Sequence, residues 1–365
     1  NFLMFNINLI TYIIVFYTLI VPINAYSVSK KCNNIKKICN VLDKVVGIKT
    51  PMMIASGTII SDNLIITNRH VVEDHKQFII KFNDGKIKKA FPLAHNFPAD
   101  LALLTLNKEL DVPNELFFSN KIKGLINVVA FDQGRNSNRI YNKGKIISFS
   151  DIQKYPQGRI HTTAKSLPGN SGGVAVDEDG NFVGILASGD GNINEIIPIV
   201  LINEVLKNTN EIYNDQFLKT GKYIRLCADN LDISFNTNKN LDKKIVNNID
   251  DYCWKSNNKQ LIDQAGQTFG RLGDLRRSTK FLKKSVELDP MSPNSLLSLA
   301  ITYHIDRKIE KERPLIKRLL KLTPDNPQVL RLGVQVAGIL KDKEMSVNVL
   351  DLMGKYNKDA LPLAK

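Results

Sequence analysis

A glycine-rich turn, Leu167-Pro168-Gly169-Asn170-Ser171-Gly172-Gly173, lies between two apolar, strand-like runs of the chain. Ser171 suits a nucleophile held at a tight turn, because the neighbouring glycines let a substrate approach the backbone. The amides of Gly169 and Ser171 can point at the same spot and form an oxyanion hole, worth about 3 kcal/mol per donor in a transition state. Glycine-rich turns with a serine are also common in ordinary hairpins, so the turn alone leaves both interpretations open.

The composition is that of an ordinary folded protein with room for two domains. Of the 365 residues, 43% are hydrophobic and 24% are charged. The net charge of +14 would permit binding to nucleic acid or to an anionic surface. Lysine is scattered among asparagine and isoleucine, however, and no basic block with interleaved aromatic residues occurs. We therefore expect no nucleic-acid partner.

The N-terminal segment and the cysteines predict export. Residues 9–21 form an apolar run with the length of a signal-peptide core, and Ala25 suits a cleavage site, which makes residues 1–25 a signal peptide. No Lys or Arg precedes the run, so an uncleaved membrane anchor is the alternative. An exported chain with an even number of cysteines is expected to form local disulfides, here among Cys32, Cys39, Cys227 and Cys253. No zinc-ligand spacing occurs, and neither a metal nor a cofactor is predicted.

Residues 41–206 have the pattern of a β domain. Short apolar or alternating runs occur at residues 57–60, 64–67, 78–82, 101–106, 128–131, 144–149, 174–176 and 182–186. Turn signals such as Asn83-Asp84-Gly85 separate them. Many short strands joined by such turns indicate an antiparallel barrel or sandwich, which the helix-like residues 199–208 would close.

The rest of the chain divides into a connector and a helical repeat. Residues 207–258 are rich in Asn, Asp and Lys and weakly patterned, and they predict a connector with some helix. Residues 259–365 are helical in period, with a repeat of 34 residues that relates Pro290 to Pro324 and Pro293 to Pro327. This all-α region resembles about three tetratricopeptide (TPR) repeats, a family whose solenoids bind peptides or proteins. An unrelated helical bundle is the alternative.

The resemblance to TPR repeats depends on marker residues, and fewer of these markers are present toward the C-terminus. The first unit has the family's markers at Gly266, Phe269, Ser278 and Pro290. The second unit has Glu312 where a small residue is usual. The third unit lacks the aromatic and the closing proline, as expected of a capping repeat. The resemblance implies a protein partner for this region.

Two further residues of the β domain could assist Ser171 as a nucleophile. Acyl transfer by a serine needs a base and a buried carboxylate that orients the base. His70 follows a strand-like run and precedes a short apolar pair, and Asp100 stands directly before the apolar residues 101–104. A carboxylate that meets the core needs a partner, and a histidine N–H is a natural one. His75 and His95 lie among polar loop residues and are expected to be exposed.

Three motifs in this order resemble the trypsin-like serine proteases: Thr67-Asn68-Arg69-His70-Val71-Val72, Ala99-Asp100-Leu101-Ala102-Leu103-Leu104 and Pro168-Gly169-Asn170-Ser171-Gly172-Gly173. The most similar branch is the bacterial high-temperature-requirement (HtrA or Deg-type) proteases. The resemblance covers residues 41–206 and implies a double β-barrel in an exported, periplasmic or secreted protein. His70 would be the general base, Asp100 its orienter and Ser171 the nucleophile. Gly169 and Ser171 would supply the oxyanion hole.

The resemblance also implies substrate-binding segments and a mode of regulation. Leu186-Ala187-Ser188-Gly189 would form the strand that pairs with the substrate backbone. Lys165 would lie near the base of the primary specificity pocket, where its charge favours acidic side chains; the alternative is a lysine that extends into solvent. Asn170 stands where digestive trypsins carry an Asp that binds a freshly cut N-terminus. Activation by N-terminal insertion is therefore not expected.

The predicted function is an exported serine endopeptidase that acts on proteins or peptides and recruits them, or a regulator, through its helical repeats. A non-catalytic binding protein with a protease-like fold is the alternative. An esterase of the α/β-hydrolase type would need the order Ser, Asp, His and a G-x-S-x-G motif. If the repeats only recruit, deleting residues 259–365 should spare the hydrolysis of small peptides.

Overall fold

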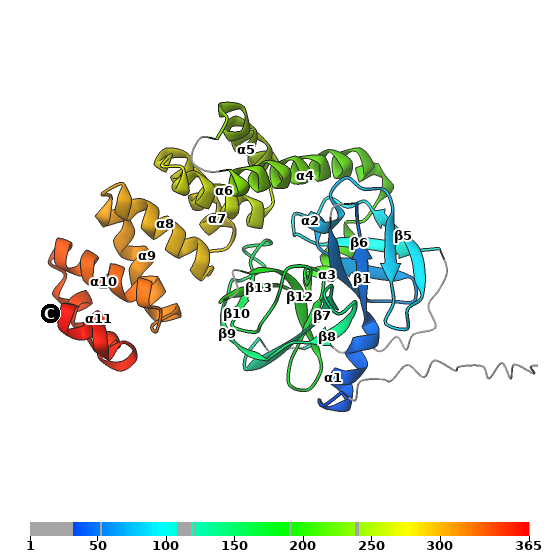
Figure 1. Cartoon of the computed structure of the whole chain (residues 1–365), viewed down its shortest axis with the longest axis horizontal. Coiled ribbons are helices and arrows are strands. Elements are labelled where there is room, and N and C mark those ends of the chain that lie inside the picture. Colours follow the sequence, from blue (N-terminus) through cyan, green and yellow to red (C-terminus); the bar gives the residue numbers. More distant parts are fainter. Residues whose placement is uncertain are drawn as a thin grey trace, which may run out of the picture. The chain divides into compact units, whose positions relative to one another are not determined.

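The computed structural model describes residues 32–51, 53–107, 118–119, 122–189, 192–237 and 241–364, and Figure 1 shows the chain coloured along its sequence. The expected signal peptide, residues 1–25, lies outside the described residues. Residues 34–365 form one unit, which contains every described strand and helix. Within the described residues, no helix is both long enough and apolar enough to cross a membrane.

Six strands form the first barrel. They are β1 (Val45–Lys49), β2 (Ile54–Ile59), β3 (Leu64–Thr67), β4 (Phe78–Lys81), β5 (Ile87–Leu93) and β6 (Ala102–Leu106). The closed order is β1-β2-β3-β6-β5-β4. Successive side chains of a strand point to opposite faces. Aliphatic residues on the inner face therefore fill the barrel, among them the fully buried Val46, Ile48, Ile65 and Ile80.

The remaining strands form the second barrel. They are β7 (Leu125–Asp132), β8 (Ser137–Ile140), β9 (Gly144–Phe149), β10 (Ile160–Thr162), β11 (Val174–Val176), β12 (Phe182–Gly189) and β13 (Asn194–Pro198). The order β11-β12-β13-β10-β9-β7 closes because β11 also pairs with β7, while β8 extends the sheet beside β7. The expected all-β double barrel is confirmed.

A shared apolar core joins the two barrels. Ile66 and Leu103 from the first barrel pack in one buried cluster with Val129, Val174 and Ile185 from the second. This cluster lies directly behind the segments that carry the candidate catalytic residues. The short helices and 3-10 turns of residues 34–213 are α1 (Lys36–Val41), η1 (Leu42–Lys44), α2 (Arg69–Val72), α3 (Leu201–Lys207) and η2 (Glu211–Tyr213).

The connector between barrels and repeats has more helix than its weak pattern predicted. It contains α4 (Asn214–Asn236) and α5 (Lys243–Ser256), which pack against each other. The buried positions of α4 recur at helical spacing and include Phe217, Gly221, Ile224, Cys227 and Leu231. Polar Asn230 and Ser234 lie among these buried positions. The apolar period is therefore diluted, which explains why the sequence indicated a helix only faintly.

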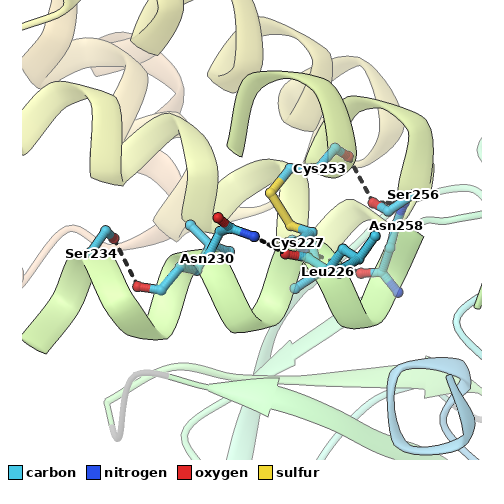
Figure 2. The surroundings of a disulfide bond; sticks show 9 residues. Leu226, Cys227, Asn230, Ser234, Cys253, Ser256 and Asn258 are labelled. Carbon is cyan, nitrogen blue, oxygen red and sulfur yellow. Dashed lines mark hydrogen bonds between the residues drawn. A yellow bond between two sulfur atoms is a disulfide. The ribbon is translucent and has the colours of Figure 1, made fainter. Parts of the chain in front are cut away.

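A disulfide between Cys227 and Cys253 joins α4 to α5, as Figure 2 shows. Cys32 and Cys39 are disulfide-bonded as well, so none of the four cysteines is free. The Cys227–Cys253 bond closes a loop with a sequence separation of 26. A cross-link of that span stabilises a folded chain mainly by restricting the unfolded chain.

Replacing both Cys227 and Cys253 with alanine should lower the free energy of unfolding by about 3 kcal/mol, the size expected for a loop of this length. Urea unfolding followed by circular dichroism measures the change. An unchanged midpoint would show that the helix packing alone holds α4 against α5.

Helices of the C-terminal region recur at a constant interval. They are α6 (Lys259–Arg271), α7 (Leu275–Leu288), α8 (Pro293–Ile305), α9 (Ile309–Leu322), α10 (Pro327–Leu340) and α11 (Lys343–Tyr356), followed by η3 (Lys358–Ala360) and α12 (Leu361–Ala364). Helices α6, α8 and α10 start at intervals of 34 residues, and so do helices α7, α9 and α11. Neighbours in this order pack as antiparallel pairs (Figure 1). Glu312 occupies a repeat position where a small residue is usual, and it is buried. Its carboxylate lies 2.9 Å from Nδ1 of His304 on the facing helix.

Candidate active site

His70 and Asp100 meet at the end of two adjacent strands of the first barrel. His70 lies in α2 directly after β3, and Asp100 precedes β6, which pairs with β3. The His70 amide donates to Asp100 Oδ1 at 3.0 Å, and His70 Nδ1 lies 2.7 Å from Oδ2. Because an ionised carboxylate only accepts, Nδ1 carries a proton and Nε2 is left as a base.

Asp100 is fully enclosed and held ionised. Burial by itself would raise its pKa, but the charges of His70 and Arg159 and the hydrogen bonds from His70 outweigh burial and hold the pKa below its usual value. Arg159 is also buried, with Nη2 3.9 Å from Oδ2. A second side chain reaches the carboxylate from the helical region: Asn258 Nδ2 donates to Oδ1 at 2.8 Å. This contact could not be predicted from the sequence, in which Asn258 has only the pattern of a residue that precedes a helix.

The Ser171 turn is built by glycine and anchored by Asn170. The Asn170 amide donates to the Leu167 carbonyl at 3.0 Å, and Gly169 has φ of +89°, which is the geometry of a type II turn with proline before glycine. The buried Asn170 side chain accepts from the Leu167 amide at 2.7 Å and donates to Phe131 O at 3.1 Å. Asn170 is thus satisfied within the barrel.

Close packing brings the serine turn to the strand that leads to His70. The Ser56 amide of β2 donates to Ser171 O at 2.8 Å. A Cβ on Gly172 would stand 2.4 Å from Thr67 Oγ1, at the end of β3, so only glycine allows this approach. The two segments that carry the candidate base and nucleophile are therefore pressed together across the barrel interface.

The hydroxyl of Ser171 points to a backbone carbonyl. Its Oγ donates to Ala187 O at 2.9 Å, and in the described part of the chain no hydrogen bond joins it to His70. The amides of Gly169 and Ser171 donate to no described residue, which leaves both available to an incoming oxygen.

Comparison with protein families agrees with this geometry. Residues 55–185 match the model of the trypsin-like peptidase domain. Because of this match, the two barrels are referred to below as the peptidase domain. The match agrees with the resemblance of the three motifs to the trypsin-like serine proteases.

Relatives of the peptidase domain include HtrA-type proteases. The serine endoprotease DegS of Escherichia coli K12 is 28% identical over 186 residues, covering 47% of this chain and 50% of DegS. The putative protease Do-like 13 of Arabidopsis thaliana is 32% identical over 189 residues, covering 48% of this chain and 37% of that protein. The solved HtrA-type protease AlgW with a tripeptide is 25% identical, covers 47% of this chain and 61% of its own, and has a TM-score of 0.41. The chain thus spans about half the length of DegS, and the shared part is the peptidase domain.

The end of β12 lies beside the Ser171 turn. Residues 186–189 pair with β13 on one side, whereas β11 pairs only with the earlier part of β12. On that second side Leu186 exchanges backbone hydrogen bonds with Gly172 and Gly173, and among the described residues no strand pairs with Ser188 and Gly189 there. Leu186 and Ala187 are buried, Ser188 is half-buried and Gly189 is exposed. Lys165 is exposed, and among the described residues no ion pair involves it.

His95 is buried in the peptidase domain, so the expectation that it is exposed was wrong. It is only 4% exposed, its Nε2 donates to Leu101 O at 2.9 Å, and its ring packs edge-on against Phe217 of α4. The loop looks polar in sequence, but α4 covers it. Burial, with a smaller contribution from the charge of Arg69, lowers the pKa of His95 to about 4.

This buried histidine should make the fold sensitive to acid. The unfolded chain binds the proton near pH 6.5, whereas folded His95 resists it until about pH 4, so acidification through this window favours unfolding. Between pH 7 and pH 5 the unaltered chain should lose about 2 kcal/mol more stability than His95→Gln, which cannot titrate. Urea unfolding at the two pH values measures this difference, and equal losses would contradict it.

Three buried side chains of the described region lie close enough to share a metal ion: His161, Glu195 and Asp289. The Lys259 ammonium already occupies their centre, in contact with Glu195 Oε1 and 3.7 Å from Asp289 Oδ2. His161 Nε2 lies 2.9 Å from the same Asp289 oxygen. Because a lysine cation neutralises the carboxylates, the cluster fits a buried ion-pair network better than a metal centre.

Proposed function

We propose that the chain is a serine endopeptidase of the HtrA type. The observation that supports it best is the two-point contact between His70 and Asp100, which leaves Nε2 of His70 as a base. The Ser171 turn packs closely against Thr67, at the end of the strand that leads to His70. The proposed roles are nucleophile for Ser171, general base and then acid for His70, and orienter for Asp100.

The proposed steps use Ser171, His70 and two backbone amides in turn. When Ser171 Oγ leaves Ala187 O, His70 Nε2 takes its proton and Oγ attacks the scissile carbonyl carbon. The oxygen that becomes negative is stabilised by the amides of Gly169 and Ser171. His70 returns the proton to the leaving amine, and water then releases the acyl group by the same steps in reverse order.

Substrate binding is proposed on the open edge of β12. An extended peptide that adds a strand beside Ala187-Ser188-Gly189 would lay its scissile bond at Ser171. Residue 189 is a glycine because a Cβ there would stand 1.6 Å from Asn194 Oδ1 of β13. For side-chain preference, the exposure of Lys165 supports the alternative in which its ammonium extends into solvent.

Location and partners are proposed from the rest of the chain. Disulfide bonds support export, because reducing compartments keep cysteines as thiols. The 34-residue period of α6 to α11 supports a TPR-like solenoid that binds a protein or peptide.

Labelling with a fluorophosphonate probe tests the proposal, because this probe reacts only with an activated serine and needs no knowledge of the substrate. We expect labelling of the full chain and hydrolysis of unfolded casein, both blocked by prior treatment with phenylmethylsulfonyl fluoride. A folded chain that takes no probe and spares casein would favour the non-catalytic binding protein.

A further inference from the structure

The junction between α5 and α6 reaches the back of the candidate active site. Helix α5 ends at Ser256 and is followed by its C-cap Asn257, which has φ of +47°, and α6 is capped by Asn258. Asn258 Oδ1 accepts from the Leu261 amide at 3.2 Å, while its Nδ2 donates to Asp100 Oδ1. One side chain therefore caps a helix of the helical region and binds the carboxylate that orients His70.

Neighbouring contacts hold this junction in place. Gln157 of the second barrel donates to Asn257 O at 2.9 Å and accepts from the Lys259 amide at 3.0 Å, so it grips the backbone on both sides of Asn258. On the other side, Ser256 Oγ donates to Cys253 O and accepts from the Asn258 amide (Figure 2). The disulfide, the helix end and Asn258 thus form one connected support.

Asp100 has few other partners for its negative charge. Among the described residues, the hydrogen-bond donors to its carboxylate are the amide and the ring of His70 and the side chain of Asn258. Arg159 is too distant to donate, at 3.9 Å. A carboxylate that is 2% exposed cannot turn to water for a replacement. Without Asn258, Oδ1 would keep only the bond from the His70 amide, and the carboxylate would be free to rotate away from Nδ1.

We propose that Asn258 is a positioning residue for the triad, and that the helical region thereby completes the active site instead of only recruiting substrates. This inference rests on the proposed peptidase function. Hydrogen bonds to buried charges are among the strongest in proteins, so loss of the Asn258 bond should lower kcat about 10- to 100-fold. KM for a short peptide should stay unchanged, because Asn258 does not touch the substrate-binding edge of β12.

Three variants of the full chain separate positioning from capping. Asn258→Ser keeps a good N-cap but is too short to reach Asp100, whereas Asn258→Ala loses both roles. Asn326→Ala is the matched control: Asn326 caps α10 by accepting from the amides of Gln328 and Val329, and within the described residues no hydrogen bond joins it to the barrels. Activity is measured on a short fluorogenic peptide, and folding is measured by circular dichroism and thermal unfolding.

We expect both Asn258 variants to lose kcat by a similar factor, with Asn258→Ser more thermostable than Asn258→Ala because it keeps the helix cap. Asn326→Ala should lose stability but keep its kcat. Full kcat in a folded Asn258→Ser would overturn the positioning role while leaving the proposed function intact. No hydrolysis and no fluorophosphonate labelling by the unaltered chain would overturn the proposed function and this inference together.

Discussion

Ser171→Ala is expected to abolish proteolysis, with a fall in kcat on the order of 10⁶. The alanine removes the hydroxyl that forms the acyl intermediate in the proposed mechanism. The backbone of the turn should not change, because its anchors are the Asn170 side chain and the backbone of Ser171. The amide of residue 171 also stays, so the oxyanion hole persists and peptides should still bind.

Casein hydrolysis and fluorophosphonate labelling measure the loss, and fluorescence polarisation of a labelled peptide measures the retained binding. Ser61→Ala, at a turn outside the site, is the control and should keep full activity. Labelling that survives in Ser171→Ala would place the reactive serine elsewhere and refute the assignment.

Asp100→Asn is expected to lower kcat on the order of 10⁴ through the wrong tautomer of His70. Two donors, the His70 amide and Asn258 Nδ2, point at Oδ1, and they would hold the oxygen of the new amide at that position. The amide nitrogen must then face His70 Nδ1 at the former place of Oδ2. Nδ1 becomes an acceptor, the proton moves to Nε2, and His70 can no longer act as a base.

The pH dependence of kcat/KM distinguishes the wrong His70 tautomer from misfolding. A folded enzyme with the wrong tautomer should regain activity at high pH, where hydroxide replaces His70 as the base. Asp84→Asn, an exposed turn residue, is the matched control. Unchanged activity in Asp100→Asn would remove Asp100 from the proposed mechanism.

Local sequence motifs predicted the peptidase domain well, but they could not predict contacts between residues that are far apart in the chain. His70, Asp100 and Ser171 each stand at a strand end or a tight turn, where short sequence patterns are informative. Asn258 bonds to Asp100 across 158 residues, and the pattern around it indicates only the start of a helix. The predicted exposure of His95 was wrong for the same reason, since nothing in the sequence of its loop indicates that α4 covers it.

In the helical region, the sequence period predicted the spacing of the helices but not their contacts outside the repeat. The 34-residue repeat predicted the interval at which helices begin, because each unit must bury the same positions against its neighbours. It could not predict what the first helix touches outside the repeat. With Lys259 in the ion-pair network and Asn258 on Asp100, we now expect that deleting residues 259–365 impairs even the hydrolysis of small peptides.

The position of Asn258 in the chain also sets an order of events during biosynthesis. His70, Asp100 and Ser171 leave the ribosome well before Asn258, and α6 can form only after the residues that follow it have emerged. A nascent chain would thus hold its nucleophile with an unsupported Asp100 until α6 has folded. For an exported protease, this order would delay full activity until α6 has emerged and folded, which would protect the machinery that makes and moves the chain.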